Sequence, residues 1–195
     1  KGVYNMAITA EYIETLKAEL QNGVDKSFYK EWVINTTDTR GAFIVSKSKL
    51  SSQQYGAALE SHIKTKFGWG DQADNISGDS LTPNGKKVEI KCSIEDSKGG
   101  FNYVQIRPSH TVDYYLLANY SIRMDEVIFL LCPKKEFIDL VVENGQLAHG
   151  TKEATFEYTE FAYRPKMHAR EGTKGRAQWD ALQQWKIEEN TLYGT

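Results

Sequence analysis

The sequence predicts one domain of the α/β (α+β) class, in which helices flank a mixed central sheet. Three observations support this. The predicted elements follow one another as helix, three strands, helix and strand, an order typical of a mixed sheet. A chain of 195 residues suffices for one ordinary domain with its own core. Hydrophobic residues form 40% of the chain and charged residues 26%, the composition of a globular protein.

The first third of the chain predicts helices. Residues 9–21 indicate an amphipathic helix, because apolar side chains recur on one face, and residues 24–46 indicate a short helix and a loop. Residues 51–67 indicate a second amphipathic helix, with an apolar side chain every four residues from Tyr55. Ser51 or Ser52 is suited to cap its N-terminus.

Strands follow. Residues 86–94 alternate, which places Val88 and Ile90 on one face and Glu89 and Lys91 on the other. The turn residues 83–85 precede this strand, and a shorter strand at 79–81 precedes the turn, so the two predict a hairpin.

The remaining elements are shorter or less regular. Residues 101–107 predict a third strand, and residues 110–120 predict a helix. The apolar run at 126–132 predicts a fully buried strand that Pro133 ends. Two further predicted helices lie at 135–143 and near 176–187, the second with tryptophan and leucine side chains at helical spacing.

Several classes of protein are disfavoured. Cys92 and Cys132 are too few for a disulfide framework and lack zinc-site spacing, which favours free thiols and a cytoplasmic location. The longest apolar run, 127–132, is far too short to span a membrane. The sequence contains neither a phosphate-binding Gly-x-x-x-x-Gly-Lys-Ser loop nor a Gly-x-Ser-x-Gly elbow, so we expect no nucleotide cofactor and no serine hydrolase.

The predicted hairpin contains the residues that could take part in a reaction. Glu89 and Lys91 lie two apart on one strand and therefore project from the same face. Asp79 lies across the turn and can reach Glu89. Converging carboxylates repel each other unless a cation lies between them, and Mg²⁺ suits oxygen ligands and leaves positions for phosphate and water. A lysine beside such a cluster can stabilise charge on a phosphate or orient the attacking water.

Each of these residues also has an ordinary interpretation. Asp79 suits a turn, since aspartate is common there. Glu89 and Lys91 suit the solvated face of an amphipathic strand. Glu60, a further candidate on the predicted helix at 51–67, suits an exposed helix position with Lys64 four residues on. The joint occurrence, rather than any single residue, favours a site.

The segment Asp79 to Glu89-Ile90-Lys91 resembles the Asp…(Asp/Glu)-x-Lys motif of the PD-(D/E)xK nuclease superfamily, most closely its type II restriction endonucleases. The family's proline before the aspartate is Gly78 here. The resemblance implies an αβββαβ core at about residues 50–133. It also implies a supporting glutamate on the preceding helix, the place of Glu60, and Mg²⁺ held by Asp79, Glu89 and Glu60, with Lys91 catalytic. Gln105 could face the same site.

The partner implied is double-stranded DNA. The net charge of −2 argues mildly against it, but residues 163–176 carry a net charge of +4. We predict DNA contacts at Arg164, Lys166, Arg170, Lys174, Arg176, Lys98, Asn102 and Arg107. The flanking regions 9–46 and 145–195 would add DNA contacts or a dimer interface. A dimer is expected because the restriction endonucleases that the motif resembles are usually homodimers.

Three other functions remain open at this point. The first is a resolvase or nickase, that is, a structure-specific or repair nuclease of the same fold. The second is a DNA-binding module with a vestigial nuclease core. The third is a small-molecule enzyme, which predicts a closed apolar pocket rather than an open cleft rimmed by cations.

Overall fold

A computed structural model describes most of the chain after residue 51. The described residues are 52–72, 74, 76–96, 99–121, 126–143, 162–173 and 175–194. The predicted helix at 9–21, the segment 24–46 and the cap candidate Ser51 lie outside them, as do Lys98 and Lys174.

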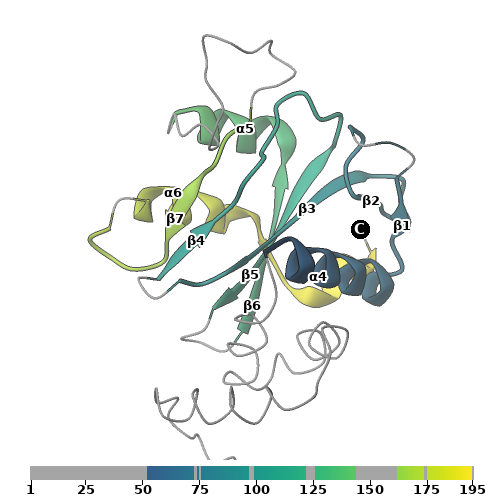
Figure 1. Ribbon diagram of the computed structural model, residues 1–195, viewed down its shortest axis with the longest axis horizontal. Helices are drawn as coiled ribbons and strands as arrows, with labels where there is room; N and C mark the ends of the chain where they lie inside the picture. Colours follow the sequence, from purple (N-terminus) through teal and green to yellow (C-terminus); the bar gives the residue numbers. More distant parts are fainter. Residues whose placement is uncertain are drawn as a thin grey trace, which may run out of the picture.

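The elements form a six-stranded mixed sheet, a two-stranded ribbon and flanking helices (Figure 1). In chain order they are α4 (Ser52–Phe67), β1 (Gly70–Asp71), β2 (Ser80–Leu81), β3 (Lys87–Ile94), β4 (Gly100–Asn102), β5 (Tyr114–Ser121), β6 (Glu126–Pro133), α5 (Lys134–Glu143), β7 (Lys166–His168), α6 (Arg176–Leu182), the 3-10 turn η3 (Gln183–Trp185), β8 (Lys186–Ile187) and the 3-10 turn η4 (Glu189–Gly194). The sheet order is β1-β2-β3-β5-β6-β8, and β4 pairs with β7 in the ribbon.

The sheet is mixed because β3 and β5 run parallel, whereas the other neighbouring strands run antiparallel. Successive residues of a strand face opposite sides, so each face has its own apolar layer. On one face Phe67 of α4 packs into a cluster with Leu116. On the other face Phe137 of α5 and Leu182 of α6 belong to a cluster with Leu117. Figure 1 shows β4, β7 and α6 on the opposite side of the molecule from β1 and β2.

The predicted fold class is confirmed: the molecule is a mixed α+β structure with a central mixed sheet flanked by helices. The helices predicted at 51–67 and 135–143 and the strands predicted at 86–94 and 126–132 correspond to α4, α5, β3 and β6. Both cysteines are free thiols, Cys132 buried and Cys92 half-buried. Within the described residues, no helix is long and apolar enough to cross a membrane.

The predicted helix at 110–120 is wrong. Its main part is the strand β5, between β3 and β6 and buried over seven of its eight residues. A strand covered on both faces is apolar at consecutive positions, so it shows no alternation to distinguish it from a buried helix.

Two other elements are shorter than predicted. The strand expected at 101–107 is regular only as β4, since Gln105 takes a left-handed conformation (φ 58°) that interrupts extended backbone. The terminal helix ends at Leu182, and η3 and β8 continue the chain.

Candidate active site

The predicted site residues of the helix and the hairpin line one polar cavity of about 430 Å³ beside β3. Five carboxylates but only three lysine and arginine side chains line it, so the cavity is acidic overall. Its lining residues are Glu60, Lys64, Asp71, Gln72, Asp74, Gly78, Asp79, Glu89, Lys91, Gln105, Arg107 and His110.

The β2–β3 hairpin positions Asp79. Ser80 pairs with Val88, and the Asp79 N–H donates to the Val88 carbonyl at 2.9 Å. Beyond this point β2 no longer covers the edge of β3. There the Asp79 side chain, instead of the β2 backbone, binds the edge of β3: its Oδ2 accepts a hydrogen bond from the Ile90 N–H at 2.8 Å. Asp79 is therefore bound to the strand that carries Glu89, and it is Asp74 whose carboxylate accepts the turn hydrogen bond from the Ser77 N–H.

Gly78, immediately before Asp79, has a backbone conformation that glycine adopts readily. Its φ of 85° is one that proline cannot adopt. A Cβ at this position would lie 2.6 Å from Cγ1 of Val112 and 2.8 Å from the Val88 carbonyl oxygen. A side chain at this position would therefore force Val112 or the backbone at Val88 to shift.

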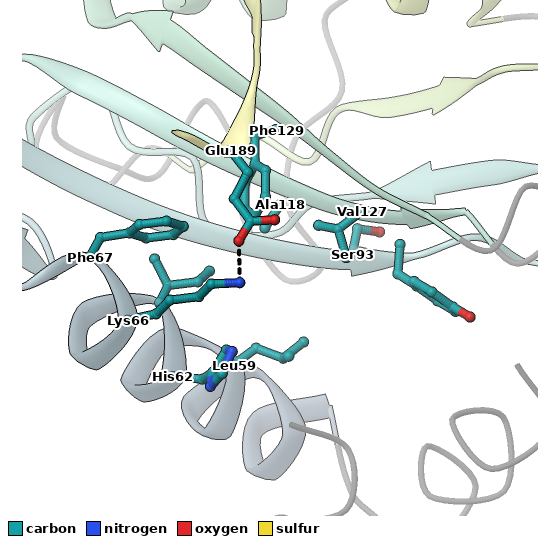
Figure 2. Close-up of a pocket in the computed structure, with 11 residues that line it drawn as sticks. Leu59, His62, Lys66, Phe67, Ser93, Ala118, Val127, Phe129 and Glu189 are labelled. Atoms are coloured by element: carbon teal, nitrogen blue, oxygen red, sulfur yellow. Dashed lines mark ion pairs between the residues drawn. The ribbon is translucent and has the colours of Figure 1, made fainter. Parts of the chain in front are cut away.

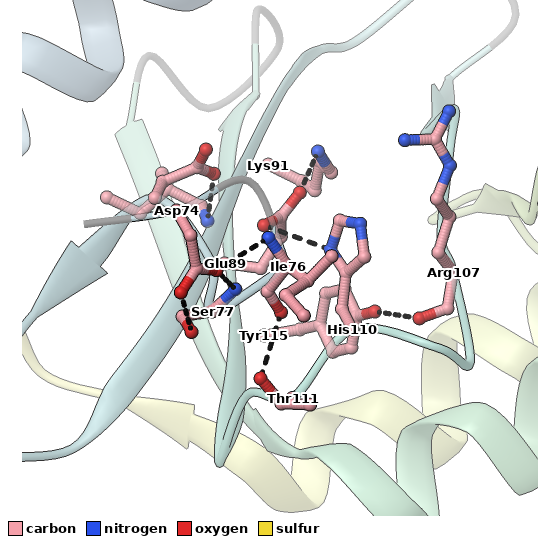
Figure 3. Close-up of polar contacts among 11 residues, drawn as sticks. Asp74, Ile76, Ser77, Glu89, Lys91, Arg107, His110, Thr111 and Tyr115 are labelled. Atoms are coloured by element: carbon pink, nitrogen blue, oxygen red, sulfur yellow. Dashed lines mark hydrogen bonds and ion pairs between the residues drawn. The ribbon is translucent and has the colours of Figure 1, made fainter. Parts of the chain in front are cut away.

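Glu89 and Lys91 interact directly. Lys91 Nζ lies 2.5 Å from Oε1 of Glu89, and Nδ1 of His110 lies 3.4 Å from Oε2 of the same carboxylate (Figure 3). Glu89 retains 4% exposure and His110 6%, so both are buried. Sequence reasoning missed His110, because a histidine 21 residues from Glu89 on a loop has no local pattern that links the two.

The connection from β4 to β5 forms the opposite wall of the cavity and carries Gln105, Arg107 and His110. Several hydrogen bonds fix it. The Tyr115 hydroxyl donates to the Arg107 carbonyl at 2.9 Å, and the Thr111 hydroxyl donates to the Ile76 carbonyl at 3.2 Å (Figure 3). The Thr111 N–H donates to the same carbonyl at 2.6 Å. Gln105 is exposed and, among the described non-glycine residues, alone has a positive φ. Such strained conformations persist where the surrounding structure enforces them, often at functional sites.

Glu60 makes the predicted ion pair and also lies at the cavity, while its part in holding metal stays a prediction. It forms the i,i+4 ion pair with Lys64 at 2.8 Å, and it also lines the cavity. Lys64 makes a second ion pair at 2.8 Å with Asp71 of β1. The sequence predicts Lys64 only as the partner of Glu60, and no local pattern indicates that Asp71, Gln72 and Asp74 belong to the same cavity.

The carboxylates of the cavity perturb one another. Burial raises the pKa of Asp79 to about 6, with further contributions from the negative charges of Glu89 and Glu60. Burial alone would also raise the pKa of Glu89, but the contact with His110 and the positive charge of Lys91 outweigh it and lower that pKa. Asp79 is therefore the carboxylate whose charged form is disfavoured here, mainly by burial and then by the neighbouring negative charges.

The chemistry of this donor set fits a divalent cation. A cation would relieve the repulsion between two partly desolvated carboxylates that face one polar space. Mg²⁺ in proteins is commonly held by one or two carboxylates, with water and phosphate oxygens completing its shell. No three His, Cys, Asp or Glu side chains in the described part of the chain are arranged as an ion site. Asp79, Glu89 and Glu60 all line the cavity and could supply carboxylate ligands to such a cation.

The described residues predicted to contact DNA lie at three places: the cavity, the β4–β7 ribbon and the start of α6. Arg107 lines the cavity, whereas Arg164, Lys166 and Arg170 are exposed near the β4–β7 ribbon. The Arg164 guanidinium is held by a hydrogen bond from its Nε to Oδ1 of Asn102, at 3.0 Å across the ribbon.

Arg176 differs from the exposed cations of this region. Its guanidinium bonds within the molecule, to the Ala169 carbonyl at 2.8 Å and to Asp180 at 2.7 Å. These contacts give Arg176 a structural role at the start of α6.

A second cavity, of about 120 Å³, lies between α4 and the sheet and is mainly apolar. Figure 2 shows Leu59, Phe67 and Phe129 lining it, with an ion pair between Lys66 and Glu189 at its side. It is smaller than the polar cavity and contains none of the predicted catalytic residues.

Comparison with known proteins leaves the function to be argued from the site. The sequence matches no family profile and no curated protein sequence. Among solved structures, the chain is similar to the bacterial homing endonuclease I-Ssp6803I, with a TM-score of 0.35 and 17% sequence identity. The match covers 70% of this chain and 95% of the other. A likeness at this level carries no argument about function.

Proposed function

We propose that the protein is a Mg²⁺-dependent endonuclease that hydrolyses phosphodiester bonds of double-stranded DNA. One observation carries the proposal: two carboxylates and a lysine, Asp79, Glu89 and Lys91, meet in an open polar cavity at the edge of one strand. The mainly apolar cavity beside α4 lacks these groups, which disfavours a small-molecule enzyme built around it.

Each residue has a role that follows from its surroundings. Asp79 and Glu89 would hold Mg²⁺, and Glu60 would add negative charge from α4. Bound Mg²⁺ supplies a Lewis acid for the phosphate and lowers the pKa of water. Lys91, already at Glu89, would stabilise charge on the phosphate or orient the water. The water oxygen forms the new bond to phosphorus and loses a proton to solvent. The bond from phosphorus to the 3′ oxygen breaks, and the 3′ oxygen takes a proton from solvent, which leaves a 5′-phosphate and a 3′-hydroxyl.

A type II restriction endonuclease is the form of this activity that we propose. The exposed cations of the β4–β7 ribbon, and Arg107 at the cavity, would contact the DNA backbone and bases. We propose a homodimer that cuts one strand per subunit at a short specific site, as part of a restriction-modification system. Sedimentation of the protein with and without its DNA tests the dimer.

The test is incubation of the protein with plasmid DNA, with and without Mg²⁺, followed by sequencing of the ends. Discrete fragments that require Mg²⁺ are expected. Cutting restricted to junctions or mismatches would favour a resolvase or nickase. The variants Asp79→Ala, Glu89→Ala and Lys91→Ala should each abolish cutting, with Asp139→Ala on α5 as the matched control. DNA binding without cutting by the wild type would instead indicate a vestigial core, and unchanged rates in the three variants would contradict the site.

A further inference from the structure

Glu89 has a different cationic or polar partner at each of its carboxylate oxygens. Lys91 Nζ lies 2.5 Å from Oε1, and His110 Nδ1 lies 3.4 Å from Oε2. The two partners differ in freedom. The Lys91 side chain is 20% exposed, whereas that of His110 is only 8% exposed. One side of the carboxylate is therefore held by a group that can move toward solvent, and the other by a group enclosed in protein.

The backbone around His110 is anchored on both sides. The His110 N–H donates to the Arg107 carbonyl at 3.2 Å, and the next residue, Thr111, bonds through its own N–H to Ile76 at 2.6 Å. Among the described residues, Nδ1 of His110 has no hydrogen-bond partner. Its contact with Glu89 is longer than the usual 2.7–3.2 Å of such a bond. A buried polar atom without a full partner is costly, so a small approach to Oε2 would be favourable.

We propose that His110 is a positioning residue for Glu89: its Nδ1 holds Oε2, so that Oε1 faces the cation site once Lys91 turns to the phosphate. This inference rests on the proposed function. Side chains that orient metal ligands in this way commonly contribute about 10- to 100-fold to metal affinity or activity. His110 itself touches neither the cation nor the DNA in this role.

The position of Nδ1 allows a sharp test. An asparagine side-chain nitrogen is separated from Cβ by the same number of bonds as Nδ1, so His110→Asn keeps a donor in its place. His110→Leu keeps the bulk and removes the donor, and His110→Gln moves the donor one bond farther from the backbone. His62 of α4, which lines the other cavity, provides the matched control as His62→Asn.

The primary measurement is Mn²⁺ binding by the full-length protein, followed by electron paramagnetic resonance without DNA. Plasmid cutting against Mg²⁺ concentration is measured in parallel. We expect Mn²⁺ binding to weaken about 10- to 100-fold in His110→Leu, to stay within a few-fold of wild type in His110→Asn, and to be unchanged in His62→Asn. Circular dichroism confirms folding. If His110→Leu does not fold, the comparison of His110→Asn with His110→Gln decides, and equal binding by those two overturns the inference.

The other outcomes separate this inference from the proposed function. Wild-type binding by His110→Leu, or equally weak binding by His110→Leu and His110→Asn, would overturn the role of the Nδ1 donor. A wild-type protein that binds Mn²⁺ but never cuts DNA would overturn the proposed function. The Mn²⁺ affinities of the His110 variants would still test whether His110 positions Glu89. A wild-type protein that binds no Mn²⁺ would overturn both.

Discussion

Asp79→Asn is the substitution that best separates the effect of the cavity's charge on folding stability from its effect on DNA cutting. The Asp79 carboxylate accepts a hydrogen bond from the Ile90 N–H at 2.8 Å. The amide oxygen of asparagine can accept the same bond with nearly the same geometry. The change therefore removes the charge of the side chain and little else. Because burial, and then Glu89 and Glu60, raise the pKa of Asp79 to about 6, that charge is unfavourable in the folded protein without metal.

The expected size follows from the two pKa values. A folded-state pKa of about 6 against an ordinary 3.8 corresponds to at most roughly 3 kcal/mol. The folded state binds the proton more tightly, so the stability of the wild type falls as pH rises from 3.8 to about 6, and the full cost applies above that range. Asp79→Asn lacks this cost. It should match the wild type in acid and exceed it above pH 6 by up to that amount.

Urea unfolding in the presence of a chelator measures this difference at a pH below 3.8 and at a pH well above 6. Asp139→Asn, on the exposed surface of α5, is the control and should change stability by less than about 0.5 kcal/mol at either pH. Asp79→Asn should also lose DNA cutting and stabilisation by Mg²⁺. A variant no more stable than wild type above pH 6, or equally stabilised at both pH values, would refute the electrostatic account.

Three further substitutions test other parts of the site. Gly78→Ala should destabilise the fold by about 1–3 kcal/mol in urea unfolding, because its Cβ would lie 2.6 Å from a valine methyl carbon. The control Gly56→Ala, whose Cβ would have no atom within 4 Å, should be neutral or stabilising. Equal effects of the two substitutions would contradict the clash at Gly78. Gln105→Gly removes the strain of a left-handed backbone and should raise the free energy of unfolding by up to about 1 kcal/mol while slowing DNA cutting. A lower free energy of unfolding in this variant would argue against strain at Gln105. Arg164→Ala should lower the slope of log affinity for DNA against log salt by about 1, whereas Arg176→Ala should mainly lower stability; unchanged salt dependence in Arg164→Ala would remove the ribbon from the interface.

The parts of the site that local sequence rules could predict are those made by neighbouring residues. Alternation along 86–94 placed Glu89 and Lys91 on one face, and the turn at 83–85 brought Asp79 beside them, as the hairpin has it. Both rules describe contacts between residues about ten apart or fewer, where the backbone leaves few alternatives. The same reasoning did not foresee that the Asp79 side chain would bind the edge of β3 at Ile90.

The parts that failed depend on the whole sheet. Whether 114–121 is helix or strand is decided by what covers it, since a run buried on both faces suits either. His110 belongs to the cavity only because its loop lies over β3, and no local sequence pattern predicts its contact with Glu89. The bonds of Arg176 to Ala169 and Asp180 were likewise not predicted from its basic stretch, and its DNA contact stays a prediction.

The wrong helix at 110–120 and the missed His110 have one cause. Because β5 begins at Tyr114 and runs parallel to β3, the chain must cross from one end of β3 back to the other before β5 can start. The described residues of that crossing contain the short β4 and a loop rather than a helix. A loop can follow the face of β3 that carries Glu89 and Lys91, and hydrogen bonds from Thr111 and Tyr115 fix it there. The strand that replaced the predicted helix is thus what places the second wall of the cavity opposite the hairpin.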